Sequence, residues 1–452
     1  MDYTSNILDS VSKLHFTGIG GIGMSALAEI LRYDGYEISG SDTNSSKITE
    51  RLENLGITFN QGNCSEFVND CELLIYTAAV KPDNPELVAA REKGIPTIER
   101  SELLGCVQRK FPESVAVAGT HGKTTVTSMI SCILIADGID PTVCAGGIIP
   151  SIGSNARVSN GDCFVCEACE YVDSFLQLSP KYSVITNVEH DHIDYFKTLD
   201  DVIDSFAEFI SQSQYVILNS DDPNALTAIK KSNKPAITFG YTQGDYHTEN
   251  VVFENGYPSF DVVEKGEILG RVKLAVPGDF NIMNALAAIA VSRTLGAEFS
   301  SVISGLYDFK GASRRFEYVG TCNGAPVYDD YGHHPDEIKV TLNAAKMFPK
   351  SRCICVFQPH TYTRTEAFKA EMASALSCAD LVVLAPIYAA RETNETGISS
   401  SDIAQLIDDA VYLQSFEDIS NFLKSEARSD DLIIIMGAGN INQLSTMIVD
   451  RK

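Results

Sequence analysis

Residues 115–134 read "VAVAGTHGKTTVTSMISCIL" and decide the fold class of this 452-residue chain. The apolar run at 115–118 predicts a buried strand, and the glycine-containing segment at 119–125 predicts a tight loop. Apolar residues then recur at helical spacing, at Val126, Met129, Ile130 and Ile133. A strand, a loop ending in Gly-Lys-Thr and a helix, in this order, are typical of a phosphate-binding loop (P-loop) in an α/β protein.

The residue types of the loop indicate what it holds. Backbone N–H groups of such a loop, together with the positive end of the helix, face nucleotide phosphates. We expect Lys123 to add a charge for the β- and γ-phosphates of ATP, and the Thr124 hydroxyl to bind Mg²⁺. The general pattern has a further glycine where this chain has Val117, so the loop is a variant form, and a glycine turn that binds nothing is the alternative. The residues expected to bind ATP here are Gly119, Thr120, His121, Gly122, Lys123, Thr124 and Thr125.

Short β-branched apolar runs alternate with helical patterns on both sides of this loop, which predicts parallel α/β sheets. The predicted strands lie at 13–20, 71–79, 114–120, 182–188, 215–220, 352–358, 380–386 and 431–437. Strand-like runs separated by glycine turns at 236–278 predict extra antiparallel strands in the middle of the chain.

Two junctions divide this pattern into three domains. A first α/β unit ends near Phe111-Pro112, and a turn-rich stretch, "RFEYVGTCNGAP", precedes a new strand near 315–325. We therefore expect an N-terminal Rossmann-like domain at 1–111 and a central P-loop-type mononucleotide-binding α/β domain with the extra antiparallel strands at 112–319. A C-terminal Rossmann-like α/β domain is expected at 320–452.

The composition argues against several kinds of partner. The formal net charge is −25, from 35 basic and 60 acidic residues, which disfavours nucleic acid or an anionic membrane surface as the main partner. The N-terminus has no basic segment followed by a long apolar run, so we expect no signal peptide and no membrane insertion. Twelve cysteines in a large chain of this kind suggest reduced thiols and a cytoplasmic location.

A second glycine loop lies near the N-terminus, in "HFTGIGGIGMSALAEIL" at 15–31. Gly18-Ile19-Gly20-Gly21-Ile22-Gly23 matches G-x-G-x-x-G between a strand and a helix, and Asp42 follows at the end of the next strand. The motif predicts a diphosphate at a helix N-terminus. Because NAD(P) and a UDP-sugar both carry a pyrophosphate, the loop does not distinguish them, and a tight turn without a ligand is the third interpretation.

Six of the eight histidines lie in compact polar stretches. They are His121 in the P-loop, His190 and His192 in "TNVEHDHIDYF", His333 and His334 in "DDYGHHPDE", and His360 in "VFQPHTYTRT". These stretches follow predicted strands, and open α/β sheets bind ligands at the carboxyl ends of their strands. We expect at least three of these histidines to be functional.

Residues 163–170 read "CFVCEACE" and look like the start of an iron–sulfur or zinc motif. The ferredoxin pattern needs a fourth cysteine at the position of Asp173. Strand alternation places Cys163 and Glu167 on one face and Cys166 on the other. We interpret the cysteines as packing, and Glu167 as a magnesium ligand at the end of a strand.

Several motifs, taken in order, resemble one family. They are "GTHGKTT", "EACE" followed by "SFL", "NVEHDHIDYF", "GDFNIMNALAAIA", "RRFE", "DDYGHHPDEI" and "VFQPHTYTRT". Together they look like the ATP-dependent Mur ligases of peptidoglycan synthesis. The N-terminal "GIGGIGMSALAEIL", "SGSD" and "DNPELVAAREKGIP" narrow the resemblance to the members that join L-alanine to UDP-N-acetylmuramate. The resemblance runs from about residue 14 to about residue 440.

The resemblance implies a reaction. The first domain holds UDP-N-acetylmuramate on the glycine loop, the middle domain binds ATP and Mg²⁺ (or Mn²⁺), and the last domain closes over both and holds L-alanine. ATP phosphorylates the lactyl carboxylate, the amine of L-alanine attacks the acyl phosphate, and phosphate leaves to give the amide and ADP. We expect a monomer or a weak homodimer.

The resemblance also implies residue roles. The catalytic set is Lys123, Glu167, His192, His360 and Arg364, and the metal ligands are Thr124, Glu167 and His192. Further ATP contacts are Asn281, Arg315 and Asp330, and the alanine pocket is Tyr331, His360 and Arg364. The UDP-substrate residues are Gly18, Gly20, Gly21, Gly23, Met24, Ser41 and Asp42.

Three positions depart from the family pattern. Thr361 stands where members often have arginine, Phe280 where many have histidine, and Cys169 where many have a carboxylate. Thr361 concerns the binding of the alanine carboxylate, because an arginine at this position would contact that carboxylate. The helix predicted at 199–210 has no lysine, so the modified lysine of the later ligases of the pathway is not expected.

Other functions remain as alternatives, and each has a cheap test. A sister ligase or a recycling ligase that attaches a preformed peptide would need a different amine substrate. An NAD(P)-dependent oxidoreductase would explain the first glycine loop and Asp42 but leaves the P-loop unexplained. A zinc or cluster protein would use the cysteines with His190 and His192, and metal analysis would identify it.

Overall fold

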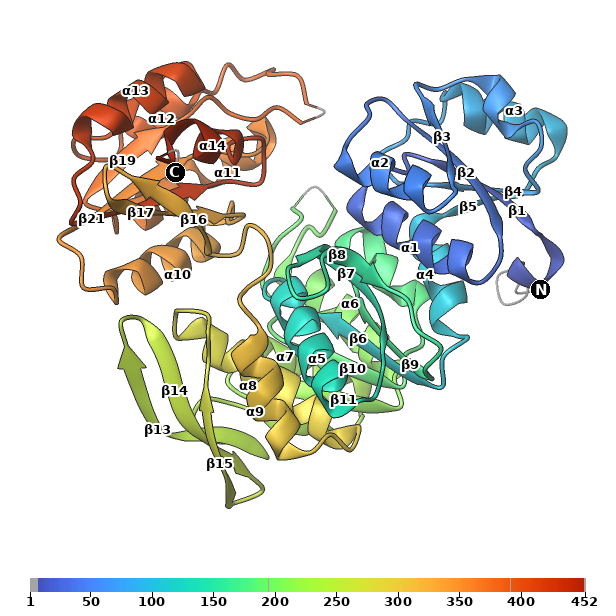
Figure 1. The fold of residues 1–452 in the computed structure, drawn as a ribbon, viewed down its shortest axis with the longest axis horizontal. Helices are drawn as coiled ribbons and strands as arrows, with labels where there is room; N and C mark the ends of the chain where they lie inside the picture. Colours follow the sequence, from blue (N-terminus) through green and yellow to red (C-terminus); the bar gives the residue numbers. More distant parts are fainter. Residues whose placement is uncertain (1–6, 194, 391, 451–452) are drawn as a thin grey trace. The chain divides into compact units, whose positions relative to one another are not determined.

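The computed structural model describes residues 7–193, 195–390 and 392–450. Within these residues the chain forms three sheets flanked by helices (Figure 1). The density of internal contacts divides it into two compact units. Unit 1 comprises Met1–Asn250, Asp261–Val272 and Met283–Phe309, and unit 2 comprises Val251–Phe260, Lys273–Ile282 and Lys310–Lys452.

The first sheet has the order β3-β2-β1-β4-β5, and all its neighbouring strands are parallel. Its strands are β1 (Lys13–Thr17), β2 (Glu37–Asp42), β3 (Thr58–Gln61), β4 (Leu73–Tyr76) and β5 (Thr97–Glu99). Its helices are α1 (Ile22–Tyr33), α2 (Lys47–Asn54), α3 (Pro85–Lys93) and α4 (Arg100–Gln108), with 3-10 turns at Leu8–Ser10 and Ser65–Val68. The chain order reverses between β1 and β4, which is where such sheets bind ligands.

The second sheet has the order β15-β14-β13-β12-β11-β10-β6-β9-β7-β8. Its strands are β6 (Glu113–Ala118), β7 (Thr142–Ile149), β8 (Ser154–Arg157), β9 (Cys163–Glu167), β10 (Tyr182–Ile185), β11 (Tyr215–Asn219), β12 (Ile237–Phe239), β13 (Tyr246–Glu254), β14 (Tyr257–Glu264) and β15 (Glu267–Lys273). The helices are α5 (Lys123–Asp137), α6 (Leu199–Ser211), α7 (Pro223–Ser232), α8 (Phe280–Thr294) and α9 (Phe299–Asp308), with a 3-10 segment, η3, at Tyr171–Gln177.

This second sheet is mixed, as the sequence predicts. Strand β6 is parallel to β9 and β10, whereas β7 and β8 are antiparallel to each other. Strands β13, β14 and β15 are joined by two-residue turns whose backbones have positive φ, Asn255-Gly256 and Lys265-Gly266. Such turns are typical of tight β-hairpins. They account for the strand-like runs predicted at 236–278.

The third sheet has the order β16-β17-β21-β18-β19-β20, parallel except for the pair β16 and β17. Its strands are β16 (Glu317–Cys322), β17 (Ala325–Asp330), β18 (Arg352–Phe357), β19 (Leu381–Leu384), β20 (Val411–Tyr412) and β21 (Asp431–Met436). Its helices are α10 (Pro335–Lys346), α11 (Tyr362–Leu376), α12 (Ser400–Ala404), α13 (Phe416–Glu426) and α14 (Gln443–Ile448). Every residue of β21 is buried, because parallel sheets with helices on both faces bury both sides of their central strands.

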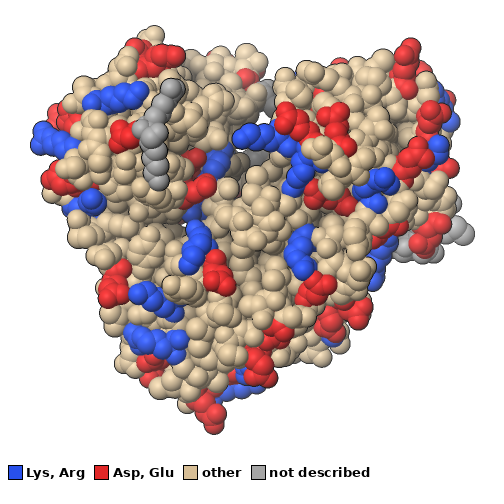
Figure 2. Space-filling model, in the orientation of Figure 1, with Lys and Arg blue, Asp and Glu red and all other residues tan. Residues whose placement is uncertain are grey.

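Each of the strands predicted from the apolar runs is present, and the predicted three-part α/β architecture is confirmed. No helix among the described residues is long and apolar enough to span a bilayer. On the face drawn in Figure 2, acidic and basic side chains are interspersed among uncharged ones.

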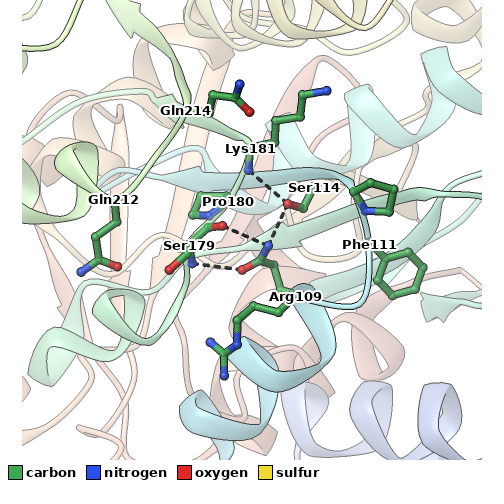
Figure 3. Close-up of a pocket in the computed structure, with 10 residues that line it drawn as sticks. Arg109, Phe111, Ser114, Ser179, Pro180, Lys181, Gln212 and Gln214 are labelled. Atoms are coloured by element: carbon green, nitrogen blue, oxygen red, sulfur yellow. Dashed lines mark hydrogen bonds between the residues drawn. The ribbon is translucent and has the colours of Figure 1, made fainter. Parts of the chain in front are cut away.

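A buried amide, that of Gln108, ties the end of α4 to Ser114 and Ser179, which Figure 3 shows on one side of a pocket. The Gln108 side chain, 2% exposed as a residue, donates from Nε2 to Ser114 Oγ (2.8 Å) and to the Ser179 carbonyl (3.2 Å). Its Oε1 accepts a hydrogen bond from the Ser179 N–H (3.0 Å). Ser114 is the second residue of β6, at the end of the sheet opposite to the P-loop, and these residues line an open pocket of about 280 Å³ there.

Candidate active site

The P-loop leaves the buried strand β6 and enters α5, as predicted. Gly119 has φ +147°, and a Cβ atom there would lie 1.9 Å from Thr186 Oγ1. Gly122, which precedes α5, has φ +86°, and its Cβ would lie 2.7 Å from Asn284 Oδ1. Both positions therefore require glycine. The resulting loop places the N-terminus of α5, whose first N–H groups have no intrahelical partner, at the carboxyl end of β6.

Thr186 and Asn187, the two residues after β10, hold the P-loop by hydrogen bonds to His121. The Asn187 side chain accepts from the His121 N–H (2.8 Å) and donates to the His121 carbonyl (3.1 Å). Thr186 Oγ1 also donates to this carbonyl (2.7 Å). Sequence reasoning missed both residues, although they begin the "TNVEHDH" stretch and directly follow a strand that pairs with β6.

Lys123 lies in a cage of oxygen atoms. Its Nζ donates to the carbonyls of Gly119 and Thr120, the second at 3.2 Å. It also donates to both carboxylate oxygens of Glu170, at 3.1 and 2.8 Å. The Glu170 side chain is 3% exposed, so the ion pair is shielded from water. Glu170 was not among the predicted site residues.

The charges of this pair hold each other in the ionised form. Burial by itself would raise the pKa of Glu170, but the Lys123 ammonium and hydrogen bonds from His192 and Lys123 outweigh burial and keep that pKa below its usual value. Burial would likewise lower the pKa of Lys123, but Glu170, Cys169 and Glu167 raise it. The loop lysine is therefore charged and already paired.

Glu167 and Thr124 form a second polar contact beside the lysine. Thr124 Oγ1 donates to Glu167 Oε2 (3.1 Å), and the Gly146 N–H donates to Glu167 Oε1. Glu167 ends β9, which pairs in parallel with β6 so that Glu167 faces Val117 in register. This register brings the carboxylate to the P-loop. A hydroxyl and a carboxylate are the hard oxygen ligands that Mg²⁺ prefers.

His192 approaches the lysine pair from the loop after β10. Its Nε2 lies 3.5 Å from Glu170 Oε1, and its ring packs on Tyr171 with centroids 4.7 Å apart. Its backbone has φ +52°, in the left-handed region that few residues other than glycine adopt. By contrast, His190 Nε2 lies 3.2 Å from the Phe196 carbonyl, a local loop contact.

The cysteines of "CFVCEACE" do not converge. Cys163 and Cys166 are buried on alternate faces of β9, and burial raises the pKa of Cys163 to about 12. Burial also raises the pKa of Cys169, which follows the strand. Among the described residues, no set of three ligand atoms gathers around these thiols. Buried cysteines such as Cys163 and Cys166 commonly pack like small apolar residues.

The N-terminal glycine loop also has the predicted form. The N–H groups of Gly18 and Ile19 donate to the Ser41 carbonyl (2.8 and 3.0 Å), and the Gly20 N–H donates to Asp42 Oδ2 (3.0 Å). Gly21 precedes α1, so the loop ends at a helix N-terminus.

The other predicted residues of this loop face inwards. Met24 is 1% exposed and Ser41 is 0% exposed, so both side chains lie in the domain interior. A Cβ at Gly23 would lie 3.2 Å from Arg100 Cδ.

In unit 2, Tyr331 is flanked by two arginines. The guanidinium carbons of Arg314 and Arg315 lie 4.9 and 5.2 Å from the centre of its ring. The neighbouring Asp330 is buried and accepts from the N–H groups of Phe316 (2.9 Å) and Gly332 (2.8 Å). Burial raises the pKa of Asp330. These contacts join the "RRFE" and "DDYGHH" stretches.

A chain of rings continues from Tyr331. Ring centroids are 5.7 Å apart for Tyr331 and His333, 5.9 Å for His333 and His360, and 5.6 Å for His360 and Tyr388. An Arg364 nitrogen lies 3.5 Å from His360 Nδ1. The three predicted alanine-pocket residues thus lie in one cluster. Tyr388 was missed, although it follows β19 in the way that His360 follows β18.

Two further predicted positions lie in unit 2. Asn281 is buried and donates from Nδ2 to the Pro277 carbonyl (2.7 Å) at the start of α8. Thr361 precedes α11 with φ +66° and ψ +147°, a backbone region that β-branched residues rarely occupy. The Thr361 N–H donates to the Tyr388 carbonyl (2.9 Å).

Comparison with family models assigns nearly the whole chain. Residues 13–112 match the Mur ligase family catalytic domain, 117–292 the Mur ligase middle domain, and 314–439 the Mur ligase glutamate ligase domain. The order of the three matches follows the order of the three sheets.

Individual relatives match over almost their full length. The chain is 46% identical to a UDP-N-acetylmuramate–L-alanine ligase of Agathobacter rectalis, over 95% of this chain and 96% of that one. It is 45% identical to one of Clostridium novyi, over 98% of each chain. The solved UDP-N-acetylmuramate-alanine ligase of Thermotoga maritima is 31% identical, with a TM-score of 0.83 over 96% of this chain and 98% of that one. The chain belongs to the Mur ligase family.

Proposed function

We propose that this chain joins L-alanine to the lactyl carboxylate of UDP-N-acetylmuramate, converting ATP to ADP and phosphate, in the synthesis of peptidoglycan precursors. The observation that carries the proposal is the gathering of Lys123, Glu170 and His192 at the end of the P-loop. Relatives of 42–46% identity that bear the name of this activity support the choice of substrates.

The site residues suit phosphoryl transfer to a carboxylate. A carboxylate is a poor electrophile, and its phosphorylation supplies a leaving group. Negative charge builds on the transferring phosphoryl group, and Lys123 with the loop N–H groups offsets it. The incoming amine then attacks the acyl phosphate, and phosphate departs as the amide forms.

The donor set beside the P-loop fits Mg²⁺, with Mn²⁺ as an alternative. Thr124 and Glu167 offer a hydroxyl and a carboxylate 3.1 Å apart, and His192 offers an imidazole nitrogen close to Glu170. When bound, the metal would neutralise phosphate charge and polarise the phosphoryl and carboxylate oxygens. Glu167 and Thr124 would hold one side of it.

We assign the remaining roles by motif. Asn281, Arg315 and Asp330 are proposed to contact ATP, and Tyr331, His360 and Arg364 the amino acid, with the guanidinium of Arg364 gripping its carboxylate. The first domain, 1–111, is proposed to bind the UDP substrate through its glycine loop. The divisions at 112–319 and 320–452, a cytoplasmic location, and a monomeric or weakly dimeric state belong to the same proposal.

A phosphate-release assay tests the proposal. Purified protein with ATP, Mg²⁺, UDP-N-acetylmuramate and L-alanine should release phosphate, and omission of any one of them should abolish the release. Release only with another amino acid or with a peptide would move the assignment to a sister or recycling ligase. A titration with NAD(P)H, where we expect no binding, tests the oxidoreductase alternative.

A further inference from the structure

The first sheet contains a buried carboxylate that the proposed chemistry does not use. Glu86 lies in the first turn of α3 and is 0% exposed. Its Oε2 accepts from Thr17 Oγ1 (2.6 Å) and Ser41 Oγ (2.7 Å), and His15 Nε2 lies 3.3 Å away. Its Oε1 accepts from the Cys64 N–H (3.3 Å).

These partners come from the ends of neighbouring strands. Thr17 is the last residue of β1, Ser41 is the next to last of β2, and Cys64 lies in the loop after β3. Glu86 itself belongs to the helix after β4. One carboxylate therefore ties together the carboxyl edge of the sheet, which is where parallel α/β sheets bind their ligands.

Ser41 links this carboxylate directly to the glycine loop. Its side chain donates to Glu86, while its carbonyl accepts the N–H groups of Gly18 and Ile19. Thr17, the other hydroxyl donor, is the residue before Gly18. A shift of either strand end would move the loop that ends at α1.

The network needs a carboxylate at its centre. His15 lies between Glu86 and Ser39, with its Nε2 3.3 Å from Glu86 Oε2 and its Nδ1 2.8 Å from Ser39 Oγ. Burial would raise the pKa of Glu86, but hydrogen bonds from His15, Thr17 and Ser41 hold it below its usual value. A glutamine would turn an N–H₂ group against at least one of the donors in either orientation of its amide.

We propose that Glu86 is a positioning residue for the UDP-substrate site, which fixes the carboxyl ends of β1 and β2 and so the glycine loop that receives the diphosphate. The inference rests on the proposed function for the identity of the ligand. Glu86 touches no reacting atom, so its removal should act on the affinity for the UDP ligand.

The test compares Glu86→Gln with Glu92→Gln, which changes an exposed glutamate on the same helix. Calorimetric titration with UDP and with UDP-N-acetylmuramate should give Kd values at least tenfold higher for Glu86→Gln, and unchanged values for Glu92→Gln. The KM values for ATP and L-alanine, and kcat at saturating UDP-N-acetylmuramate, should stay within about twofold of wild type. An unchanged Kd, or an equal loss in all parameters, would overturn the inference.

Single-bond variants keep the test decisive if Glu86→Gln does not fold. Ser41→Ala and Thr17→Val each remove one donor and leave the carboxylate, and each should raise Kd for UDP several-fold. Where Glu86→Gln does fold, Ser41→Ala added to it should raise Kd much less than Ser41→Ala does alone, because the partner is already lost. Full additivity would contradict the network. A wild-type protein that binds neither UDP nor UDP-N-acetylmuramate would overturn the proposed function, and this inference with it.

Discussion

The Nζ atom of Lys123 lies 2.8 Å from Oε2 of Glu170, and this contact joins the P-loop to the segment after β9. The cation expected to meet the phosphates of ATP is thus already balanced by an internal anion. We expect ATP and its metal to replace Glu170 as the partner of the lysine. The exchange should be visible in the stability of variants with and without nucleotide.

Glu170→Gln should lower the melting temperature of the nucleotide-free protein, by the equivalent of about 1–3 kcal/mol, because a buried ammonium loses its counter-charge. Saturating MgATP should reduce the difference from wild type, since phosphates then neutralise the lysine. Differential scanning fluorimetry measures both values. Glu208→Gln, an exposed change on α6, is the control. Equal melting temperatures without nucleotide would contradict the buried ion pair.

Lys123→Ala should abolish turnover, with a loss of at least about 10²-fold in kcat, because the developing phosphoryl charge loses its fixed cation. Binding of UDP-N-acetylmuramate should stay close to that of wild type, since the glycine loop lies on a different sheet. Phosphate release and calorimetry measure the two quantities. Loss of UDP-substrate binding in a folded variant would argue against the division of the two sites.

Asp329 should make stability depend on pH. Burial raises its pKa from 3.8 to about 7, against the opposing charge of Arg314, whose Nε lies 3.8 Å from Asp329 Oδ1. A carboxyl that binds its proton more tightly in the folded chain stabilises the fold at low pH. That contribution falls between about pH 4 and pH 7, by about 1.4 kcal/mol per pH unit, and is constant above.

Asp329→Asn removes this titration. Urea unfolding should be measured at a series of pH values. The free energy of unfolding of the variant should rise relative to that of wild type between pH 4 and pH 7, and the difference should be constant from pH 7 to pH 8. Asp430→Asn, at an exposed position of the same unit, should show no such trend. A wild type that gains on Asp329→Asn with rising pH would contradict the raised pKa.

The cysteines of β9 should be slow to react. Alkylation of the native protein at pH 8 should label Cys64 and Cys378, which are partly exposed, before Cys163 and Cys166, whose pKa values burial raises. Mass spectrometry of the peptides gives the order. Elemental analysis should find neither iron nor zinc in stoichiometric amount, and either metal bound to the peptide 163–169 would overturn the packing interpretation.

Thr361→Gly should raise the free energy of unfolding by about 1 kcal/mol, because glycine adopts the backbone of Thr361 without the strain of a branched side chain. Thr361→Ala keeps a Cβ, so its free energy of unfolding should rise by less. Thermal melts compare the three proteins. A lower melting temperature for the glycine variant would show that the side chain contributes more than its backbone costs.

Local patterns predicted much of this molecule because they depend on neighbouring residues. The P-loop needs only a strand, two glycines and a helix start, all within residues 115–134. The N-terminal glycine loop is equally local. Apolar runs likewise mark buried parallel strands wherever they occur, so the sheets could be anticipated together with the loops at their carboxyl ends.

Contacts between residues far apart in the sequence could not be predicted in this way. Glu170 meets Lys123 only because β9 lies beside β6 in the register that sets Glu167 opposite Val117. No local pattern specifies that register. Tyr388 meets His360 for a similar reason, through the parallel pairing of β18 and β19. The first glutamate of "EACE" was singled out, whereas the second became visible only in the folded chain.

The amide of Gln108 has a practical consequence for anyone who cuts or recombines this chain. Helix α4 covers the first sheet and also packs against the segment that leads into β10 of the second sheet. A Cβ at Gly105 would lie 2.2 Å from the Gln177 carbonyl oxygen, and Arg109 donates to that carbonyl at 3.2 Å. A fragment ending at residue 111 would leave this helix without those partners and expose its apolar side. In chimaeras between relatives, α4 and residues 177–181 should therefore come from the same parent protein.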